Sequence, residues 1–187
     1  THVNTAINKG YISQNDYPFR AFKVEQEEAE KVFLTPDEIT AIENVVLEKD
    51  IENCVRDLFL FSVYTGLRYG DVFSLTHDHI KKVNGQSWLI LDMEKTGDSV
   101  KIPIETLFNG KALNIIKKHF KLGVNFCFKA VTNQHCNRIL KDIAKASKIE
   151  KTIHFHSARH TTATYLIFKG VPITTVGKIL GHRKLET

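Results

Sequence analysis

The sequence has few of the cysteines that stabilise small extracellular or metal-binding domains through disulfides or bound metal. It contains only three cysteines, Cys54, Cys127 and Cys136, and none of them forms a CxxC pair. An odd number of widely spaced cysteines excludes a disulfide or zinc framework. We therefore expect reduced thiols in a cytoplasmic protein.

Long apolar runs are also missing, because no stretch approaches the roughly 18 residues that a transmembrane helix needs. Hydrophobic residues make up 42% of the 187-residue chain and charged residues 25%, which excludes a disordered or low-complexity class. The sequence therefore predicts a globular protein without a membrane anchor.

Acidic residues are scarce in the C-terminal part of the chain. Residues 110–187 carry 15 Lys and Arg but only three Asp and Glu, a net charge of +12, whereas residues 1–109 carry 11 and 18, a net charge of −7. A half-chain with this excess attracts a polyanion such as DNA or RNA. A solvated basic face is the alternative that composition alone leaves open.

Hydrophobic spacing predicts a mostly helical domain. Residues 25–31 are acidic with almost no apolar periodicity, and residues 1–31 are interpreted as the tail of a preceding element plus a linker. The segment Thr35-Pro36-Asp37-Glu38 has the pattern of a capping box and predicts the start of a helix. A helix is also predicted at about 51–64, and a third follows through Val72 and Leu75. Further helices are predicted at about 110–121, 134–147, 157–169 and 174–180.

Between these helices the period of the apolar residues changes. Residues 88–91 and 100–104 have the pattern of strands, and Thr96-Gly97-Asp98 between them is typical of a turn. The sequence therefore predicts an α+β fold, mainly α with a small antiparallel β-sheet.

Three positions outside the predicted helices carry residues suited to binding an anion. Arg68 follows the helix-ending Gly66, and its planar guanidinium matches a phosphate. Lys95 lies at the mouth of the predicted hairpin, from which a lysine can reach a neighbouring site. His182 directly follows Gly181, which ends the last helix. Taken alone, each is more often an ordinary surface or capping residue.

The segment from His156 to His160 enters a predicted helix. His156, Arg159 and His160 share one helical face, so a histidine and an arginine can grip one anion together. His154, His156 and His160 also suggest a metal site. Zinc proteases with this spacing need a glutamate after the first histidine, and Ser157 stands there, so the spacing argues against metal.

The order and spacing of these motifs together resemble the catalytic domain of tyrosine recombinases, the phage integrase family. TGLR-x-x-D at 65–71 resembles the first box of the family, and HSARHTTATYL at 156–166 resembles the second. VPITTVGKILGHRKLET at 171–187 resembles the continuation of the second box. The hairpin EKTG…VKIPI is similar to that of integrases of bacterial mobile elements, including transposons. The resemblance covers residues 32–187 and implies a tyrosine-recombinase catalytic-domain-like fold.

The resemblance implies site-specific DNA recombination or integration without a metal or another cofactor. In this family a tyrosine hydroxyl attacks a DNA phosphate, forms a 3′-phosphotyrosyl link and releases a 5′-hydroxyl. A 5′-hydroxyl of the partner duplex then reverses the step. Residues 1–31 would be the tail of a core-binding helical domain plus the linker, and residues 32–187 the catalytic domain.

The resemblance also implies roles for individual residues. Arg68 and Arg159 would clamp the non-bridging phosphate oxygens, and Lys95 would protonate the leaving oxygen. His156 would assist proton transfer at the nucleophile, and His182 would hydrogen-bond the phosphate.

Three further residues have supporting or alternative roles under this resemblance. Asp71 would orient Arg68 or His156, and His160 would pack the helix. Lys101 is the alternative for the hairpin lysine.

The chain departs from the family at the nucleophile. The tyrosine is expected about nine residues beyond the last histidine, near position 191, whereas the sequence ends at Thr187. The five tyrosines present lack the right context, so we expect a fragment that does not cleave DNA by itself. The full-length protein is expected to act on double-stranded DNA as a homotetramer in the bacterial cytoplasm, at the nucleoid, whereas the fragment would be monomeric.

Three other functions remain open at this point. The chain could be a non-catalytic DNA-binding module built on a recombinase-like domain, which would bind DNA in a salt-sensitive way without chemistry. It could be a metal-dependent hydrolase that uses His154, His156 and His160. It could also be a structural helical domain, although the +12 half-chain argues against that.

Overall fold

A computed structural model describes residues 2–17, 31–95, 97–119 and 131–181. The chain divides into two compact units, Thr1–Glu30 and Lys31–Thr187. The described part of the first unit consists of helix α1 (His2–Asn8) and the short 3₁₀ turn η1 (Gln14–Asp16). No residue of α1 is buried, so this helix lacks a core of its own.

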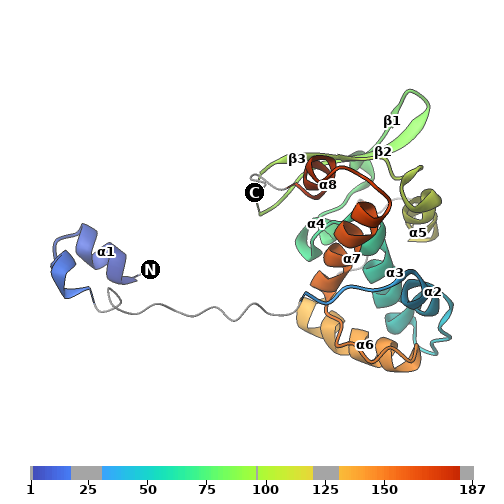
Figure 1. The fold of residues 1–187 in the computed structure, drawn as a ribbon, viewed down its shortest axis with the longest axis horizontal. Coiled ribbons are helices and arrows are strands. Elements are labelled where there is room, and N and C mark those ends of the chain that lie inside the picture. The colour runs from blue at the N-terminus through green and yellow to red at the C-terminus, as the bar shows by residue number, and fades with distance from the viewer. Residues whose placement is uncertain (1, 18–30, 96, 120–130, 182–187) are drawn as a thin grey trace. The chain divides into compact units, whose positions relative to one another are not determined.

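The second unit consists mainly of helices with one small sheet (Figure 1), which confirms the predicted fold class. Its elements are α2 (Pro36–Asn44), α3 (Asp50–Thr65), α4 (Tyr69–Phe73), η2 (His77–His79), β1 (Ile80–Val83), β2 (Gln86–Asp92), β3 (Ser99–Ile102), η3 (Leu107–Gly110), α5 (Lys111–His119), α6 (Asn133–Ala146), α7 (Phe155–Phe168) and α8 (Ile173–Leu180).

Helix α3 forms the centre of the core. It contacts α2, α5, α6 and α7 and lies among these helices (Figure 1). Phe59 and Phe61 are fully buried although they point to different sides of the helix. Truncating a phenylalanine of this kind to alanine typically costs about 3–5 kcal/mol, so α3 holds the other helices in place.

The sheet is antiparallel with the order β1-β2-β3. Leu89 and Leu91 of β2 and Val100 and Ile102 of β3 are buried, as their alternation predicts. The two predicted strands are confirmed, but β1 was not predicted. Its sequence, IKKV, is mostly exposed and too polar to show an apolar pattern.

A turn signal could have revealed β1. Asn84 and Gly85 lie between β1 and β2 with φ values of 51° and 80°. An Asn-Gly pair with both residues at positive φ is the preferred two-residue connection of a hairpin. The sequence signal was therefore in the turn and not in the strand.

The predicted capping box of α2 is confirmed. The Glu38 N–H donates to the Thr35 hydroxyl at 3.3 Å, and the Thr35 N–H donates to the Glu38 carboxylate at 2.7 Å. The helix predicted through Leu75 was too long, because α4 ends at Phe73. Helix α7 begins two residues earlier than predicted, at Phe155, where the His154 N–H donates to the Ser157 hydroxyl.

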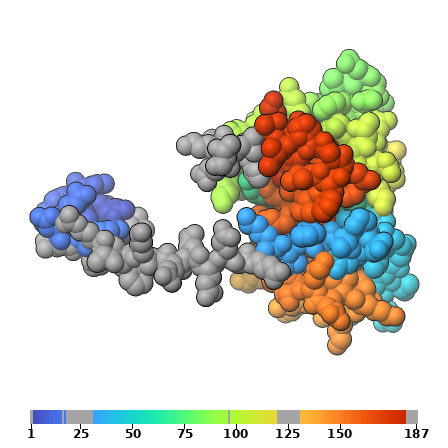
Figure 2. Space-filling view, in the orientation of Figure 1, coloured from blue at the N-terminus to red at the C-terminus, as the bar shows by residue number. Residues whose placement is uncertain are grey.

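The helices α7 and α8 lie between the sheet and α2 on one face of the second unit. In the space-filling view their surface (red) is bordered by the sheet (green) and by α2 (blue) (Figure 2). Helix α7 packs on α3, and α8 packs on both α7 and β3. This arrangement brings the start of α7 close to the α3–α4 connection and to the β2–β3 hairpin. None of the helices within the described residues is long and apolar enough to cross a membrane.

Candidate phosphate-binding site

An open cleft of about 540 Å³ collects the predicted catalytic residues that the structure describes. Arg68, Lys95, His156 and Arg159 all line it, although they come from three separate parts of the chain. His182, also predicted to act here, lies outside the described residues. Gly181, the residue before it, is the last residue that the structure describes.

The α3–α4 connection places Arg68 at the cleft. Gly66 ends α3 with a φ of 74°, a left-handed conformation that favours glycine. A Cβ at this position would also collide with the side chain of Leu180 on α8. Arg68 then precedes α4, and its Nη1 lies 3.2 Å from the sulfur of Met93 in the hairpin. The glycine therefore lets α8 approach while the chain turns Arg68 into the cleft.

Arg159 is held in place more firmly than Arg68. Its side chain is only 5% exposed, and its Nη1 donates to the Gly66 carbonyl at 2.8 Å. Its Nη2 donates to the Leu180 carbonyl at the end of α8. The guanidinium therefore ties the C-terminal ends of α3 and α8 to α7, with further N–H groups left for a ligand.

The charges in the cleft are unbalanced. Among the described residues no ion pair involves Arg68, Lys95 or Arg159. Burial and the charge of Arg68 lower the pKa of Arg159 to about 10, a change that the carboxylate of Asp71 partly offsets. Arg159 is still charged at neutral pH. Cations that form no ion pair, one of them buried, are typical of an anion site.

Asp71 fixes the backbone on two sides of the cleft. Its carboxylate is 2% exposed and accepts hydrogen bonds from the N–H of Arg68 at 3.2 Å and from the N–H of Glu94 at 2.9 Å. We expected Asp71 to orient the side chain of Arg68 or His156. Its recorded bonds run instead to backbone groups, so it joins the Arg68 loop to the hairpin that carries Lys95.

The two histidines of α7 contact each other. The rings of His156 and His160 lie at 90° with their centroids 4.7 Å apart. Partial burial and the nearby charges of His160, Arg159, Arg68 and Lys95 lower the pKa of His156. Burial, Lys31 and Arg159 lower the pKa of His160. Both shifts favour the neutral ring at pH 7, and of the two rings only that of His156 lines the cleft.

The two candidate hairpin lysines lie in different places. Lys95 is exposed and lines the cleft, whereas Lys101 lines a separate groove with Trp88 and Lys178, between the sheet and α8. Of the two, Lys95 is therefore the one that lines the same cleft as Arg68 and Arg159.

Sequence reasoning missed several residues of the cleft. Asn133 and Asn137 of α6 and Glu94 of the hairpin line it, and so does His154, which the sequence had suggested only as a metal ligand. Asn137 accepts a hydrogen bond from the Phe155 N–H at 2.8 Å and so joins α6 to the start of α7. No motif marks the two asparagines, because only the packing of α6 on α7 brings them to the site. Glu94 directly precedes Lys95 in the hairpin segment EKTG, which could have indicated it.

The metal alternative has no ligand cluster in the described part of the chain. No group of three His, Cys, Asp or Glu side chains there could hold a metal ion. His154, His156 and His160 are therefore not assembled as a ligand set.

Comparison with known proteins places the chain among recombinases. The profile of the phage integrase family matches residues 32–187. A tyrosine recombinase of Thermosipho africanus (strain TCF52B) is 32% identical over 163 residues, which cover 83% of this chain and 54% of that protein. The tyrosine recombinase XerC of Staphylococcus aureus (strain MSSA476) is 28% identical over 167 residues, with the same coverage. The chain thus spans about half the length of the curated relatives it matches.

Solved structures of integrases share the fold. A λ integrase dimer bound to a COC′ core site superimposes with a TM-score of 0.76 at 21% identity, covering 97% of this chain and 65% of that one. The Tn1549 transposon integrase in complex with circular intermediate DNA gives 0.68 at 22% identity, covering 97% and 67%. These likenesses confirm the predicted catalytic-domain fold, and the profile match assigns the family. The chain belongs to the phage integrase family.

Proposed function

We propose that the chain binds a DNA phosphodiester in this cleft and supplies the cationic and acid–base groups of site-specific recombination. One observation carries the proposal. Arg68, Lys95 and Arg159 line one cleft, and no carboxylate among the described residues forms an ion pair with any of them. A phosphate would satisfy these cations and their unused N–H groups.

The reaction depends mainly on fixed positive charge, which stabilises the transition state. In phosphoryl transfer, negative charge spreads over the equatorial oxygens, so preorganised donors aimed at them supply much of the catalysis. Arg159 is preorganised by its bonds to the carbonyls of Gly66 and Leu180. Arg68 is positioned through its backbone by Asp71. The two guanidinium groups would therefore hold the non-bridging oxygens from two sides.

Proton transfer would use the remaining residues. As a tyrosine oxygen bonds to phosphorus, its proton would pass to the neutral ring of His156, whose lowered pKa leaves it free to accept one. As the bond to the 5′-oxygen breaks, Lys95 would donate a proton to that oxygen. His182 would hydrogen-bond a non-bridging oxygen. The product is a 3′-phosphotyrosyl link, which conserves the energy of the bond.

We propose that none of the five tyrosines of this chain is the attacking residue. The last tyrosine, Tyr165, lies within α7 and stacks on Phe108 at 4.3 Å between ring centroids. It does not line the cleft. Tyr69 does line it, but its hydroxyl donates a hydrogen bond to the Val131 carbonyl, and burial raises its pKa. We therefore propose that the 187-residue chain binds DNA but does not cleave it.

The remaining parts of the proposal concern the whole protein. Residues 1–31 would be the tail of a core-binding helical domain plus its linker, and the full protein would act on double-stranded DNA at the bacterial nucleoid. A λ integrase of similar fold forms a tetramer bound to a Holliday junction. We propose a homotetramer for the full protein and a monomer for this chain.

Covalent trapping tests the proposal. A nicked duplex that releases its 5′ fragment after cleavage is incubated with a polypeptide that continues past Thr187 with its native sequence. A DNA-linked band on a denaturing gel is expected from this longer protein. The same gel carries the 187-residue chain, from which no band is expected, and the longer protein with Arg68→Ala.

Two results decide between the functions. A band that disappears with Arg68→Ala supports recombination chemistry. The absence of a band on DNA that the longer protein demonstrably binds would overturn it in favour of a non-catalytic DNA-binding module.

A further inference from the structure

Glu94 places a carboxylate in the cleft that should receive a phosphate. It directly precedes Lys95 and lines the cleft together with Lys95 and Arg68. Its Oε2 lies so close to Gly70 that a Cβ at that position would collide with it. The φ of Gly70 is not positive, so no turn requires glycine there. The missing side chain at residue 70 instead makes room for the Glu94 carboxylate.

Glu94 differs from the other carboxylate of the cleft, Asp71. Asp71 is buried and accepts two backbone hydrogen bonds, so its charge is committed to the fold. The side chain of Glu94 is exposed, and among the described residues it has no ion pair or recorded hydrogen bond. Only its backbone N–H is fixed, by Asp71. The Glu94 carboxylate is therefore free to move while its backbone stays in place.

We propose that Glu94 is an internal competitor of the DNA phosphate. Without DNA, its carboxylate partly neutralises the field of Arg68, Lys95 and Arg159, and it rotates out of the cleft when a phosphodiester enters. The carboxylate and a phosphate in the same cleft would repel each other at close range, so binding favours the rotated carboxylate. The inference rests on the proposed function, since it assumes that the anion in the cleft is DNA phosphate.

This arrangement would weaken binding to arbitrary phosphates. A duplex that fits the protein over a larger surface can supply the free energy needed to displace the carboxylate, whereas an isolated phosphate contact cannot. Because Asp71 holds the backbone of residue 94, the displacement does not require the adjacent Lys95 to leave the cleft.

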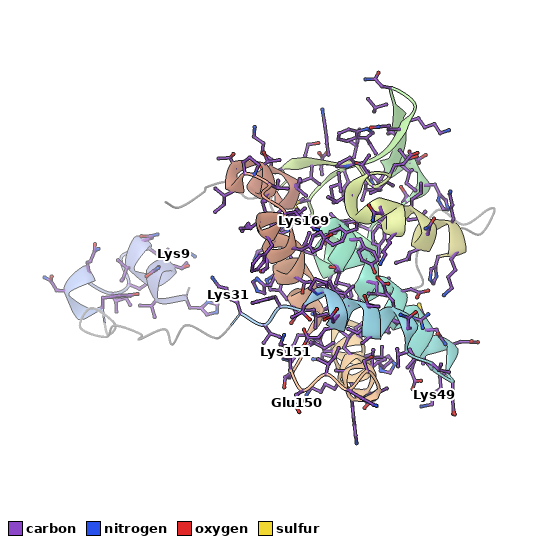
Figure 3. All side chains as sticks on the ribbon, turned by 45° about the vertical axis from the view of Figure 1, so that its right-hand side comes forward. Lys9, Lys31, Lys49, Glu150, Lys151 and Lys169 are labelled. Atoms are coloured by element: carbon purple, nitrogen blue, oxygen red, sulfur yellow. The ribbon has the colours of Figure 1, made fainter. Side chains whose placement is uncertain are left out.

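The test uses the 187-residue chain and a fluorescent duplex of about 30 base pairs, with affinity measured by anisotropy at several salt concentrations. Glu94→Gln is expected to tighten binding several-fold at low salt. The matched control is Glu150→Gln, which makes the same change in net charge on the exposed loop between α6 and α7 (Figure 3). It is expected to change the affinity by less than twofold.

A second variant moves the carboxylate without altering the charge. Gly70→Ala introduces the methyl group that collides with Glu94, so it should also tighten binding. In the Glu94→Gln background the collision no longer expels a charge, and Gly70→Ala should add nothing. This non-additivity is the signature of a direct interaction between the two residues.

The outcomes separate the inference from the proposed function. If the unmodified chain binds the duplex and Glu94→Gln matches Glu150→Gln, the competitor role is wrong and the proposed function stands. If no variant binds DNA at all, the proposed function fails and the inference fails with it. Urea denaturation of each variant shows whether a change in affinity reflects a change in folding.

Discussion

The backbone N–H of Leu34 donates a hydrogen bond of 3.0 Å to the hydroxyl of Thr161, 127 residues further along the chain. Thr161 is fully buried on α7 and donates in turn to the Ser157 carbonyl at 2.8 Å. The first residues of the second unit are thus bound to the helix that carries His156 and Arg159.

Thr161→Val should destabilise the second unit. Valine keeps the shape of threonine but leaves the buried N–H of Leu34 without an acceptor, which typically costs about 1–3 kcal/mol. Urea denaturation measures the loss. Thr161→Ser keeps the hydroxyl and should cost less, and equal losses for the two variants would show that the hydrogen bond is not responsible.

Lys151 provides a second anchor for the same segment. Its ammonium group donates to the Phe33 carbonyl at 3.1 Å and to the Glu38 carboxylate at 2.8 Å. Figure 3 labels Lys151 and Lys31 in this part of the unit. Because Lys151 is partly exposed, Lys151→Ala should lower the free energy of unfolding by only about 1 kcal/mol or less in the same assay. This loss is smaller than that expected for Thr161→Val.

Asp71→Asn should slow cleavage more than it weakens DNA binding. An amide oxygen replaces the carboxylate that accepts the N–H groups of Arg68 and Glu94, so the two sides of the cleft lose a shared anchor. The rate of covalent trapping and the affinity are compared in the longer protein. Asp78→Asn, an exposed site outside the cleft, is the control, and a loss of affinity as large as the loss of rate would contradict the positioning role.

The two arginines should respond differently to lysine. Arg159→Lys should lower both stability and DNA affinity, because an ammonium group cannot span the carbonyls of Gly66 and Leu180 with the geometry of a guanidinium. Arg68→Lys should lower affinity with little effect on stability, since Arg68 is only partly buried. Unfolding midpoints and anisotropy titrations distinguish the cases. An unchanged midpoint for Arg159→Lys would show that its carbonyl bonds do not stabilise the fold.

DNA binding should strengthen as the pH falls from about 8 to about 6. The pKa of His156 is lowered by burial and by nearby cations, whereas a bound phosphate favours the protonated ring. Binding therefore takes up a proton. Anisotropy titrations across this range measure the effect, and His156→Gln should reduce the slope. An equal slope for both proteins would assign the proton to another group.

Without DNA, the lowered pKa of His156 makes the folded protein less stable, and not more, as the pH falls. The folded-state pKa of His156 lies below its unfolded value of roughly 6.5, so the unfolded chain binds more protons as the pH falls. Protonation of His156 therefore lowers the free energy of unfolding below about pH 6.5, and it has no effect well above that pH.

Asp57 should contribute stability that is lost in acid. Burial opposes its ionisation, but hydrogen bonds from His119 and Lys118 and the charge of Arg56 outweigh burial and lower the pKa of the carboxyl to about 2. The contribution, about 2 kcal/mol, is present above roughly pH 4 and disappears as the pH falls toward 2. Urea denaturation at several pH values should show a flatter acid limb for Asp57→Asn. Asp142→Asn, an exposed site, should behave like the unmodified protein.

Local signals predicted much of the fold. The capping box at Thr35 and the glycine after Thr65 gave helix ends that the structure confirms, because caps depend on residues close in sequence. Strand β1 was missed because its polar residues carry no apolar alternation. The early end of α4 was missed because tertiary contacts, and not propensity, determine so short a helix.

The sequence by itself determined the charge asymmetry, the mainly helical class and the set of motifs that identifies the family. Only the tertiary structure decided how these residues meet. Arg159 donates hydrogen bonds to the carbonyls of Gly66 and Leu180. Asp71 accepts hydrogen bonds from two backbone segments, and Glu94 lies against Gly70. Periodicity and caps report on residues a few positions apart, whereas these contacts join segments brought together by packing around α3. The cleft and the carboxylate within it are therefore properties of the folded chain.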